Sequence, residues 1–93
     1  MAIYTTRVEL HDADWSDYET LHTKMTAQGF SRTVTSSDGK RYKMPPSEYN
    51  FDGTASRDQV FVKAKAAAAQ VKSSYAVFIT ESVGRTWHGL DAA

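Results

Sequence analysis

Residues 30–44, FSRTVTSSDGKRYKM, contain the pattern from which the rest of the fold can be predicted. Their first part, 30–35, alternates apolar and polar side chains and is rich in β-branched residues, as half-buried strands are. Asp38 and Gly39 form a pair that is favoured in tight hairpins, because glycine adopts positive φ angles without a steric penalty. We therefore predict a β-hairpin whose second strand lies at 40–44.

Two amphipathic segments flank this hairpin. Before it, residues 14–28 carry apolar side chains three or four positions apart, and Gly29 follows them as a residue that commonly ends helices. After it, Ser56 and Gln59 form the sequence pattern of a capping box in front of an alanine-rich segment. We predict one helix at 14–28 and a second helix at 57–72.

Two more strands are predicted, one before the first helix and one after the second. Residues 3–10 place two sets of side chains on opposite faces with the two-residue period of a half-buried strand. Residues 75–80, YAVFIT, form the most apolar of the predicted strands, which predicts a central position with both faces buried. Pro45 and Pro46 end the hairpin, because proline donates no ladder hydrogen bond. Residues 47–54 either resume its second strand or form an ordered loop.

The predicted order is strand, helix, strand, strand, helix, strand. This order is typical of an α+β, ferredoxin-like βαββαβ fold, in which two helices cover one face of a four-stranded antiparallel sheet. We expect residues 1–83 to form this domain and residues 84–93 to form a C-terminal tail. The open sheet face and the apolar tail residues Trp87 and Leu90 lead us to expect a homodimer. The residues expected in the core are Val8, Leu21, Met25, Phe30, Val34, Phe61, Ala64, Ala68, Val71, Val77 and Ile79.

The composition excludes several classes of function. The sequence has no cysteine, so it forms no disulfide, thiolate metal site or cysteine nucleophile. Eleven basic residues balance eleven acidic ones, which argues against tight nonspecific binding of nucleic acid. The first ten residues alternate instead of forming an apolar signal segment, and no run of about 18 apolar residues predicts a membrane span. We expect a cytoplasmic protein with no membrane partner.

The candidate catalytic residues follow the first predicted strand, although no established enzyme motif is present. His11 and Asp12 are candidates for a general base or for a metal ligand. Asp12 and Asp14 could hold Mg²⁺, but aspartate is also a preferred helix cap, which is the interpretation we favour. His22 lies beside the apolar stripe of the first helix and is expected to be structural, whereas His88 is expected to be exposed. If the protein cleaves RNA, we predict metal-independent chemistry without a cofactor, with Mg²⁺ as the alternative.

A basic cluster surrounds the predicted hairpin. It consists of Arg32, Lys40, Arg41 and Lys43, with Tyr42 between two of them in the sequence. Basic groups that hold phosphates and an aromatic ring that stacks on an unpaired base suit single-stranded RNA. Hairpin edges are also rich in lysine simply to prevent edge-to-edge aggregation. Both interpretations stay open from the residues alone.

Several short motifs resemble the GhoS-type family, whose best-known members are endoribonuclease antitoxins of type V toxin–antitoxin systems. The motifs are GFSRTV at 29–34, SDG at 37–39, Tyr42-x-Met44-Pro45, Glu48-Tyr49, the alanine-rich helix and YAVFITES at 75–82. The resemblance covers about residues 3–83. It implies a ferredoxin-like domain and an RNA-binding antitoxin that cleaves the messenger RNA of a small membrane toxin. The alternative is a noncatalytic ferredoxin-like module for binding or dimerisation.

Overall fold

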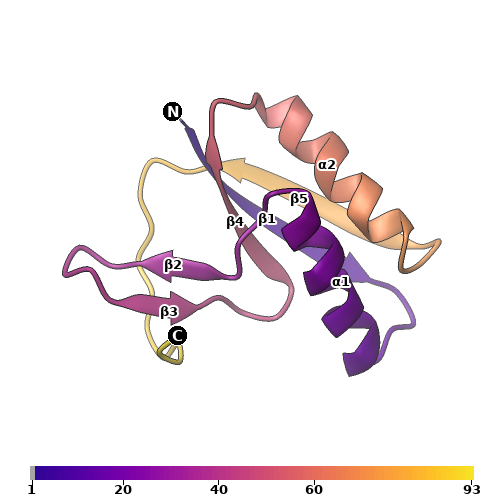
Figure 1. The fold of residues 1–93 in the computed structure, drawn as a ribbon, viewed down its shortest axis with the longest axis horizontal. Helices are drawn as coiled ribbons and strands as arrows, with labels where there is room; N and C mark the ends of the chain where they lie inside the picture. Colours follow the sequence, from indigo (N-terminus) through magenta and orange to yellow (C-terminus); the bar gives the residue numbers. More distant parts are fainter. Residues whose placement is uncertain (1) are drawn as a thin grey trace.

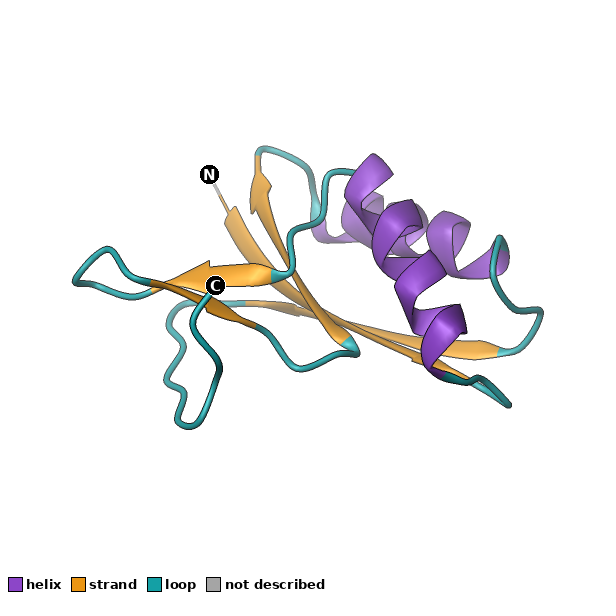
Figure 2. Ribbon diagram, turned by 60° about the horizontal axis from the view of Figure 1, so that its bottom comes forward, coloured by secondary structure: helices purple, strands orange, loops and turns teal. Residues whose placement is uncertain are grey.

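The computed structural model describes residues 2–93 and has two helices packed on one face of an antiparallel sheet, with a hairpin projecting from the side (Figures 1 and 2). The elements are β1 (Ala2–Leu10), α1 (Trp15–Ala27), β2 (Thr33–Thr35), β3 (Arg41–Lys43), β4 (Glu48–Gly53), α2 (Arg57–Ala69) and β5 (Tyr75–Glu81). The α+β class with two helices and antiparallel strands is therefore confirmed. Each helix has 13 residues, and no helix within residues 2–93 is long and apolar enough to cross a membrane.

The strands form two sheets instead of the single four-stranded sheet that we expected. One sheet has the order β4-β1-β5, and the other contains only β2 and β3. A single bridge between Ser31 and Asn50 links the chain before β2 to β4. Continuing that register would place Thr35, the last residue of β2, opposite Pro46, and Ser36 opposite Pro45, and neither proline has an N–H group to donate. The hairpin consequently leaves the edge of β4 and pairs with itself (Figure 1).

The prediction of a central strand at 75–80 is wrong. β1 is central, since it pairs with β4 on one side and with β5 on the other. β5 is an edge strand, with Val77 and Ile79 half-buried beneath the helices and Phe78 on the open face with 70% of its surface exposed. The apolar residues of this strand indicated burial on both faces, but the helices cover only one.

The core lies between the helices and the covered face of the sheet, and most of its predicted members are confirmed. Val8, Leu21, Met25, Phe30, Val34, Ala64 and Ala68 are buried, and Val71, Val77 and Ile79 are partly buried. Phe61 was predicted wrongly, because its side chain is exposed on the outer side of α2. Six further apolar residues are buried that were not among the predicted core members: Tyr4, Leu10, Met44, Tyr49, Val60 and Ala67.

Local hydrogen bonds explain where the helices begin. Asp14 caps α1 by accepting a bond from the backbone N–H of Asp17, and the Asp17 carboxylate accepts from the backbone N–H of Asp14. Ser56 and Gln59 form the same reciprocal pair at the start of α2, as predicted. α2 ends at Ala69, three residues before the predicted end. Within residues 47–54, for which the choice was open, Glu48–Gly53 form a strand, β4, but this strand pairs with β1 and does not resume the hairpin strand.

The C-terminal segment, residues 82–93, folds back across the molecule. The Ser82 N–H donates to the Ile3 carbonyl at 2.7 Å, which starts the segment beside β1. Its far end runs along β3, where the Lys43 N–H donates to Asp91 at 2.8 Å and the Ala93 N–H donates to Arg41 at 3.0 Å. The predicted tail is therefore an ordered strap between the three-stranded sheet and the hairpin.

Candidate functional site

The turn of the β2–β3 hairpin is held by its own polar residues. The Ser36 N–H donates to the Lys40 carbonyl at 2.8 Å, and the Gly39 N–H donates to Ser36 at 2.9 Å. Gly39 has a φ angle of 85°, which explains why glycine suits this position. The Asp38 carboxylate accepts bonds from the Ser36 hydroxyl and from the Lys40 N–H, and these bonds lower the pKa of Asp38. The Asp-Gly turn thus forms as the sequence predicts.

The basic residues of the hairpin divide into two groups. Lys40, Arg41 and Lys43 are exposed, and the Arg41 guanidinium donates to the Thr33 hydroxyl at 3.0 Å. Side chains alternate along β3, so the half-buried Tyr42 points to the opposite face from its two basic neighbours. Its ring lies against that of Trp87, with 5.8 Å between the ring centroids. Tyr42 is therefore a packing partner of the C-terminal segment and does not share a surface with Arg41 and Lys43.

Arg32 lies apart from this basic surface and bonds to the protein's own backbone. Its guanidinium donates to the carbonyls of Pro45 and Met44, both at 2.7 Å, and to that of Glu48. It also lies over the ring of Tyr49, 5.4 Å from the ring centroid. Partial burial lowers the pKa of Arg32, while Tyr49 and Glu48 act in the opposite direction. Arg32 donates to three backbone carbonyls around the two prolines, which makes it a structural residue of the turn before β4.

His22 has the structural position that we predicted for it. Its Nδ1 atom lies 2.6 Å from the hydroxyl of Tyr49, whose side chain is fully buried. Burial, and secondarily the positive charge of Arg32, lowers the pKa of His22. Burial raises the pKa of Tyr49 far above its ordinary value. Both groups are consequently neutral near pH 7 and form one hydrogen-bonded pair that joins α1 to β4.

His11 and Asp12 occupy the exposed turn between β1 and α1. The Nδ1 atom of His11 lies 2.7 Å from the Ser74 hydroxyl, and Asp12 adopts a positive φ of 52°. Asp14 is the helix cap described above, and hydrogen bonds from the Ser16 hydroxyl and the Asp17 N–H lower its pKa. No group of three or more His, Asp or Glu side chains within residues 2–93 is arranged to hold a metal ion.

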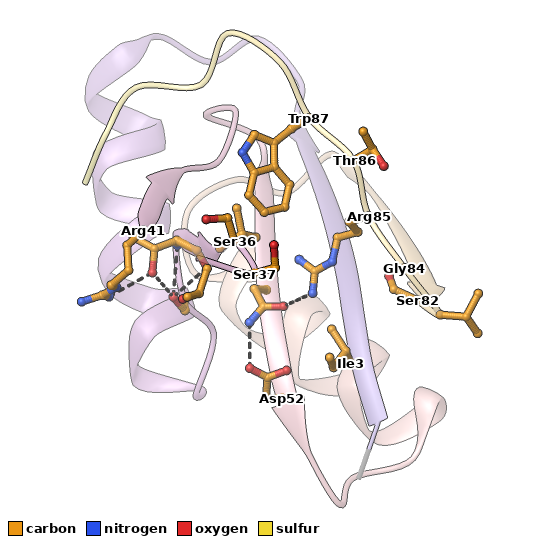
Figure 3. Close-up of a pocket in the computed structure, with 16 residues that line it drawn as sticks. Ile3, Ser36, Ser37, Arg41, Asp52, Ser82, Gly84, Arg85, Thr86 and Trp87 are labelled. Carbon is orange, nitrogen blue, oxygen red and sulfur yellow. Dashed lines mark hydrogen bonds between the residues drawn. The ribbon is translucent and has the colours of Figure 1, made fainter. Parts of the chain in front are cut away.

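A groove with a volume of about 800 Å³ lies between the hairpin, the open face of the sheet and the C-terminal segment (Figure 3). We call it the tail groove. It is lined by residues 33–37 and Arg41 of the hairpin, by Ile3, Ser31, Asn50 and Asp52 on and beside the sheet, and by residues 82–87 of the C-terminal segment. Seven serine or threonine side chains, two arginines and one indole face this space.

A polar chain forms the floor of the tail groove. The Asp52 carboxylate accepts a bond from the Asn50 amide at 3.1 Å, and the Asn50 carbonyl oxygen accepts one from the Arg85 guanidinium at 2.5 Å. The other terminal nitrogen of Arg85, Nη1, is buried and has no acceptor among the described residues. A buried donor without an acceptor is energetically unfavourable.

The remaining chemistry of the groove comes from Trp87 and Arg41. In Figure 3 Trp87 and Arg85 extend from the C-terminal segment toward the hairpin, and Arg41 points outward at the mouth. Trp87 is half-buried, and it also lines a second hollow of about 380 Å³ together with His88 and Leu90. The tail groove therefore combines a cation at its mouth, a cation on its floor and an aromatic ring on its wall.

The structure separates the predicted site residues into three places. Lys40, Arg41 and Lys43 share the exposed hairpin, and Arg32 and Tyr42 pack inside the fold. His11 and Asp12 lie at the opposite end of the long axis from the hairpin (Figure 1). Three residues of the tail groove were not predicted from the sequence, Asn50, Asp52 and Arg85, because they belong to no motif and the segment after Glu81 has no periodicity.

Comparison with known proteins adds no relative. No family model, no curated protein and no solved structure matches the chain.

Proposed function

We propose that the chain binds single-stranded RNA and that the tail groove is the binding site. The observation that carries this proposal is the joint presence of two arginines, an indole and a row of hydroxyl groups in one groove of about 800 Å³. This volume lies within the range of about 300–1,000 Å³ that is usual for ligand sites. Single-stranded RNA offers phosphates, unpaired bases and 2′-hydroxyls, and each of these has a matching partner here.

The two arginines match the phosphate backbone. Arg41 is exposed at the mouth, next to Lys40 and Lys43, so a phosphate can approach it from solvent. Arg85 lies on the floor, where its Nη1 atom has no acceptor among residues 2–93. Arginine is suited to this task because its planar guanidinium donates two parallel bonds to a phosphate. The chain has no net charge, so the affinity depends on this local cluster.

The wall of the groove matches the nucleosides. Trp87 provides an aromatic surface on which an unpaired base can stack. Hydroxyl groups of Ser36, Ser37 and Thr35, and the carboxylate of Asp52, can exchange hydrogen bonds with ribose 2′-hydroxyls. Recognition of the 2′-hydroxyl would favour RNA over DNA of the same sequence.

The topology supports the proposal of a modified ferredoxin-like fold. The strand order β4-β1-β5 and the helix positions agree with that arrangement, and the Ser31–Asn50 bridge lies where its fourth strand would join β4. In this interpretation β2 corresponds to the fourth strand of the ferredoxin-like sheet. It has left the edge of β4 and pairs with β3 instead. The fold itself carries no function, so the RNA proposal depends on the groove alone.

Cleavage of a toxin message, which the GhoS-type resemblance implies, stays a separate prediction. The candidate residues for cleavage, His11 and Asp12, lie far along the molecule from the hairpin (Figure 1). RNA held only in the tail groove would not contact them. Binding and cleavage are therefore tested separately, with the same labelled RNA read by fluorescence anisotropy and on a denaturing gel.

The binding test uses an unstructured RNA of about 12 nucleotides with a fluorescent 5′ end. Arg41→Gln is expected to weaken binding and to reduce the slope of log affinity against log salt by about 0.7, the value for one lost phosphate contact on a single strand. Trp87→Ala is expected to weaken binding by about 1–3 kcal/mol because one stacked base is lost. DNA of the same sequence is expected to bind more weakly.

Lys65→Gln is the matched control. It also removes one positive charge, but Lys65 lies on α2, on the opposite side of the sheet from the groove. The proposal is rejected if the unmodified protein does not bind this RNA at low salt. It is also rejected if Lys65→Gln weakens binding as much as Arg41→Gln does, since the effect would then be one of total charge.

A further inference from the structure

The free edge of β5 is the feature of the molecule that its own fold leaves unexplained. β5 pairs with β1 on one side and, among residues 2–93, has no strand on the other. Its sequence, Tyr75 to Glu81, is apolar over most of its length and contains the β-branched and aromatic residues that pair well with a neighbouring strand. The molecule therefore has a free edge on a strand that is suited to pairing.

This edge also lacks the usual protection against pairing. Exposed edge strands usually carry lysine, proline or a bulge, which prevents association with other strands. β5 contains neither lysine nor proline and has no bulge. Its only charged residue, Glu81, is the last residue of the strand. The β2–β3 hairpin differs in this respect, because β3 contains Arg41 and Lys43 and directly follows Lys40.

Exposed apolar side chains lie on this strand and just after it. Phe78 of β5 is 70% exposed, and Val83 lies fully exposed just after the strand. Exposed apolar side chains that lie close together commonly mark an interaction surface.

We infer that β5 pairs with β5 of a second copy of the chain, antiparallel and in the register that places Phe78 opposite itself. Phe78 is the central residue of the strand, so a two-fold axis at this position pairs all seven residues. The pairing would join two three-stranded sheets into one continuous sheet. It rests on the strand edge and is independent of the proposed RNA site.

The side chains of β5 are complementary in this register. Val77 faces Ile79 of the other copy on the helix side, which extends the apolar layer beneath α2. On the open side Phe78 meets its equivalent, and aromatic and β-branched cross-strand pairs stabilise antiparallel sheets. Glu81 faces Tyr75, so no like charges lie opposite each other. A second copy therefore fits this edge without an unfavourable contact.

The absence of cysteine allows a direct test by crosslinking. In the inferred register the Cα atoms of the two Phe78 residues lie about 4.5–5.5 Å apart, within the range that a disulfide spans. Phe78→Cys is therefore expected to form a covalent dimer rapidly under mild oxidation. Thr80→Cys is the matched control, since it lies on the same face of the same strand. In the inferred register Thr80 of one copy lies four residues along the strand from Thr80 of the other. Their Cα atoms are therefore about 14 Å apart, and cysteines at this position should not crosslink.

Sedimentation equilibrium over a concentration series completes the test. The unmodified protein is expected to dimerise, and Phe78→Lys is expected to stay monomeric with an unchanged circular dichroism spectrum, because it places two ammonium groups opposite each other at an exposed position. A protein that stays monomeric at all concentrations overturns the inference. So does a dimer in which Thr80→Cys crosslinks as fast as Phe78→Cys, or in which neither crosslinks, since either result would assign the contact to another surface.

Discussion

Replacement of Arg32 tests whether this arginine stabilises the fold, in contrast to Arg41, for which we propose a role in RNA binding. The sequence places Arg32 and Arg41 in one basic cluster, whereas the structure gives them different surroundings. Arg32 bonds to the carbonyls of Met44, Pro45 and Glu48, and Arg41 is exposed with one bond to the Thr33 hydroxyl. Arg32→Gln is therefore expected to lower the stability of the fold, and Arg41→Gln is expected to leave it nearly unchanged.

The size of the effect follows from the bonds that are lost. Hydrogen bonds to charged groups contribute about 1.5–3 kcal/mol each, and Arg32 makes three of them. The side chain is only half-buried, so water replaces part of this interaction, and we expect a net loss of about 2–4 kcal/mol. A domain of this size has a free energy of unfolding of about 5–14 kcal/mol. The loss corresponds to a fall of roughly 10–25 °C in Tm.

Thermal and urea denaturation followed by circular dichroism measure this difference. Arg41→Gln removes the same side chain and the same charge from an exposed position, so it is the matched control and should change the free energy of unfolding by less than about 0.5 kcal/mol. If the two variants melt within a few degrees of each other, Arg32 does not stabilise the turn before β4, and the reasoning from its carbonyl bonds fails.

Three further outcomes are expected. Gly29→Ala should destabilise the fold by about 1–2 kcal/mol, because Gly29 has a φ of 95° and an added Cβ would lie 3.3 Å from the Phe51 ring; Gly84→Ala, in open space, should have little effect in the same urea titration. The pKa of His22 is lowered in the folded state, so the unfolded chain binds more protons and stability should fall as the pH drops below about 6.5. His22→Gln should remove this part of the pH dependence, and an unchanged profile would contradict the assignment. Ser56→Ala should lower the free energy of unfolding by about 1 kcal/mol through loss of the α2 cap, and a melting curve that does not move would show that Gln59 alone suffices.

Local patterns in the sequence predicted the helices, the first strand and the hairpin turn well, because the interactions that form them join residues close together in the sequence. The Asp-Gly turn, the capping box at Ser56 and the alternation of β1 each depend on residues a few positions apart. The position of β5 at the edge could not be predicted in this way. An apolar strand sequence indicates that a strand is well buried, but it does not say which strands lie beside it in the sheet.

The candidate site was predictable only in part, because its long-range contacts leave no pattern in the sequence. Lys40, Arg41 and Lys43 lie on one hairpin and were found together. Arg32 was grouped with them by position, although its partners are backbone carbonyls up to 16 residues away. Arg85 reaches Asn50 across 35 residues, and only the fold brings these two side chains together.

The strap formed by the C-terminal segment has a consequence for the motions of the molecule. A two-stranded hairpin is at best marginally stable by itself, and β2 and β3 form such a hairpin outside the main sheet. Tyr42 lies against Trp87, and the backbone of β3 bonds to Asp91 and Ala93, so the hairpin cannot open without releasing this segment. The two parts therefore share one opening equilibrium, distinct from global unfolding, and the amide protons of Lys43 and Ala93 should exchange with solvent at a common rate, faster than those of β1.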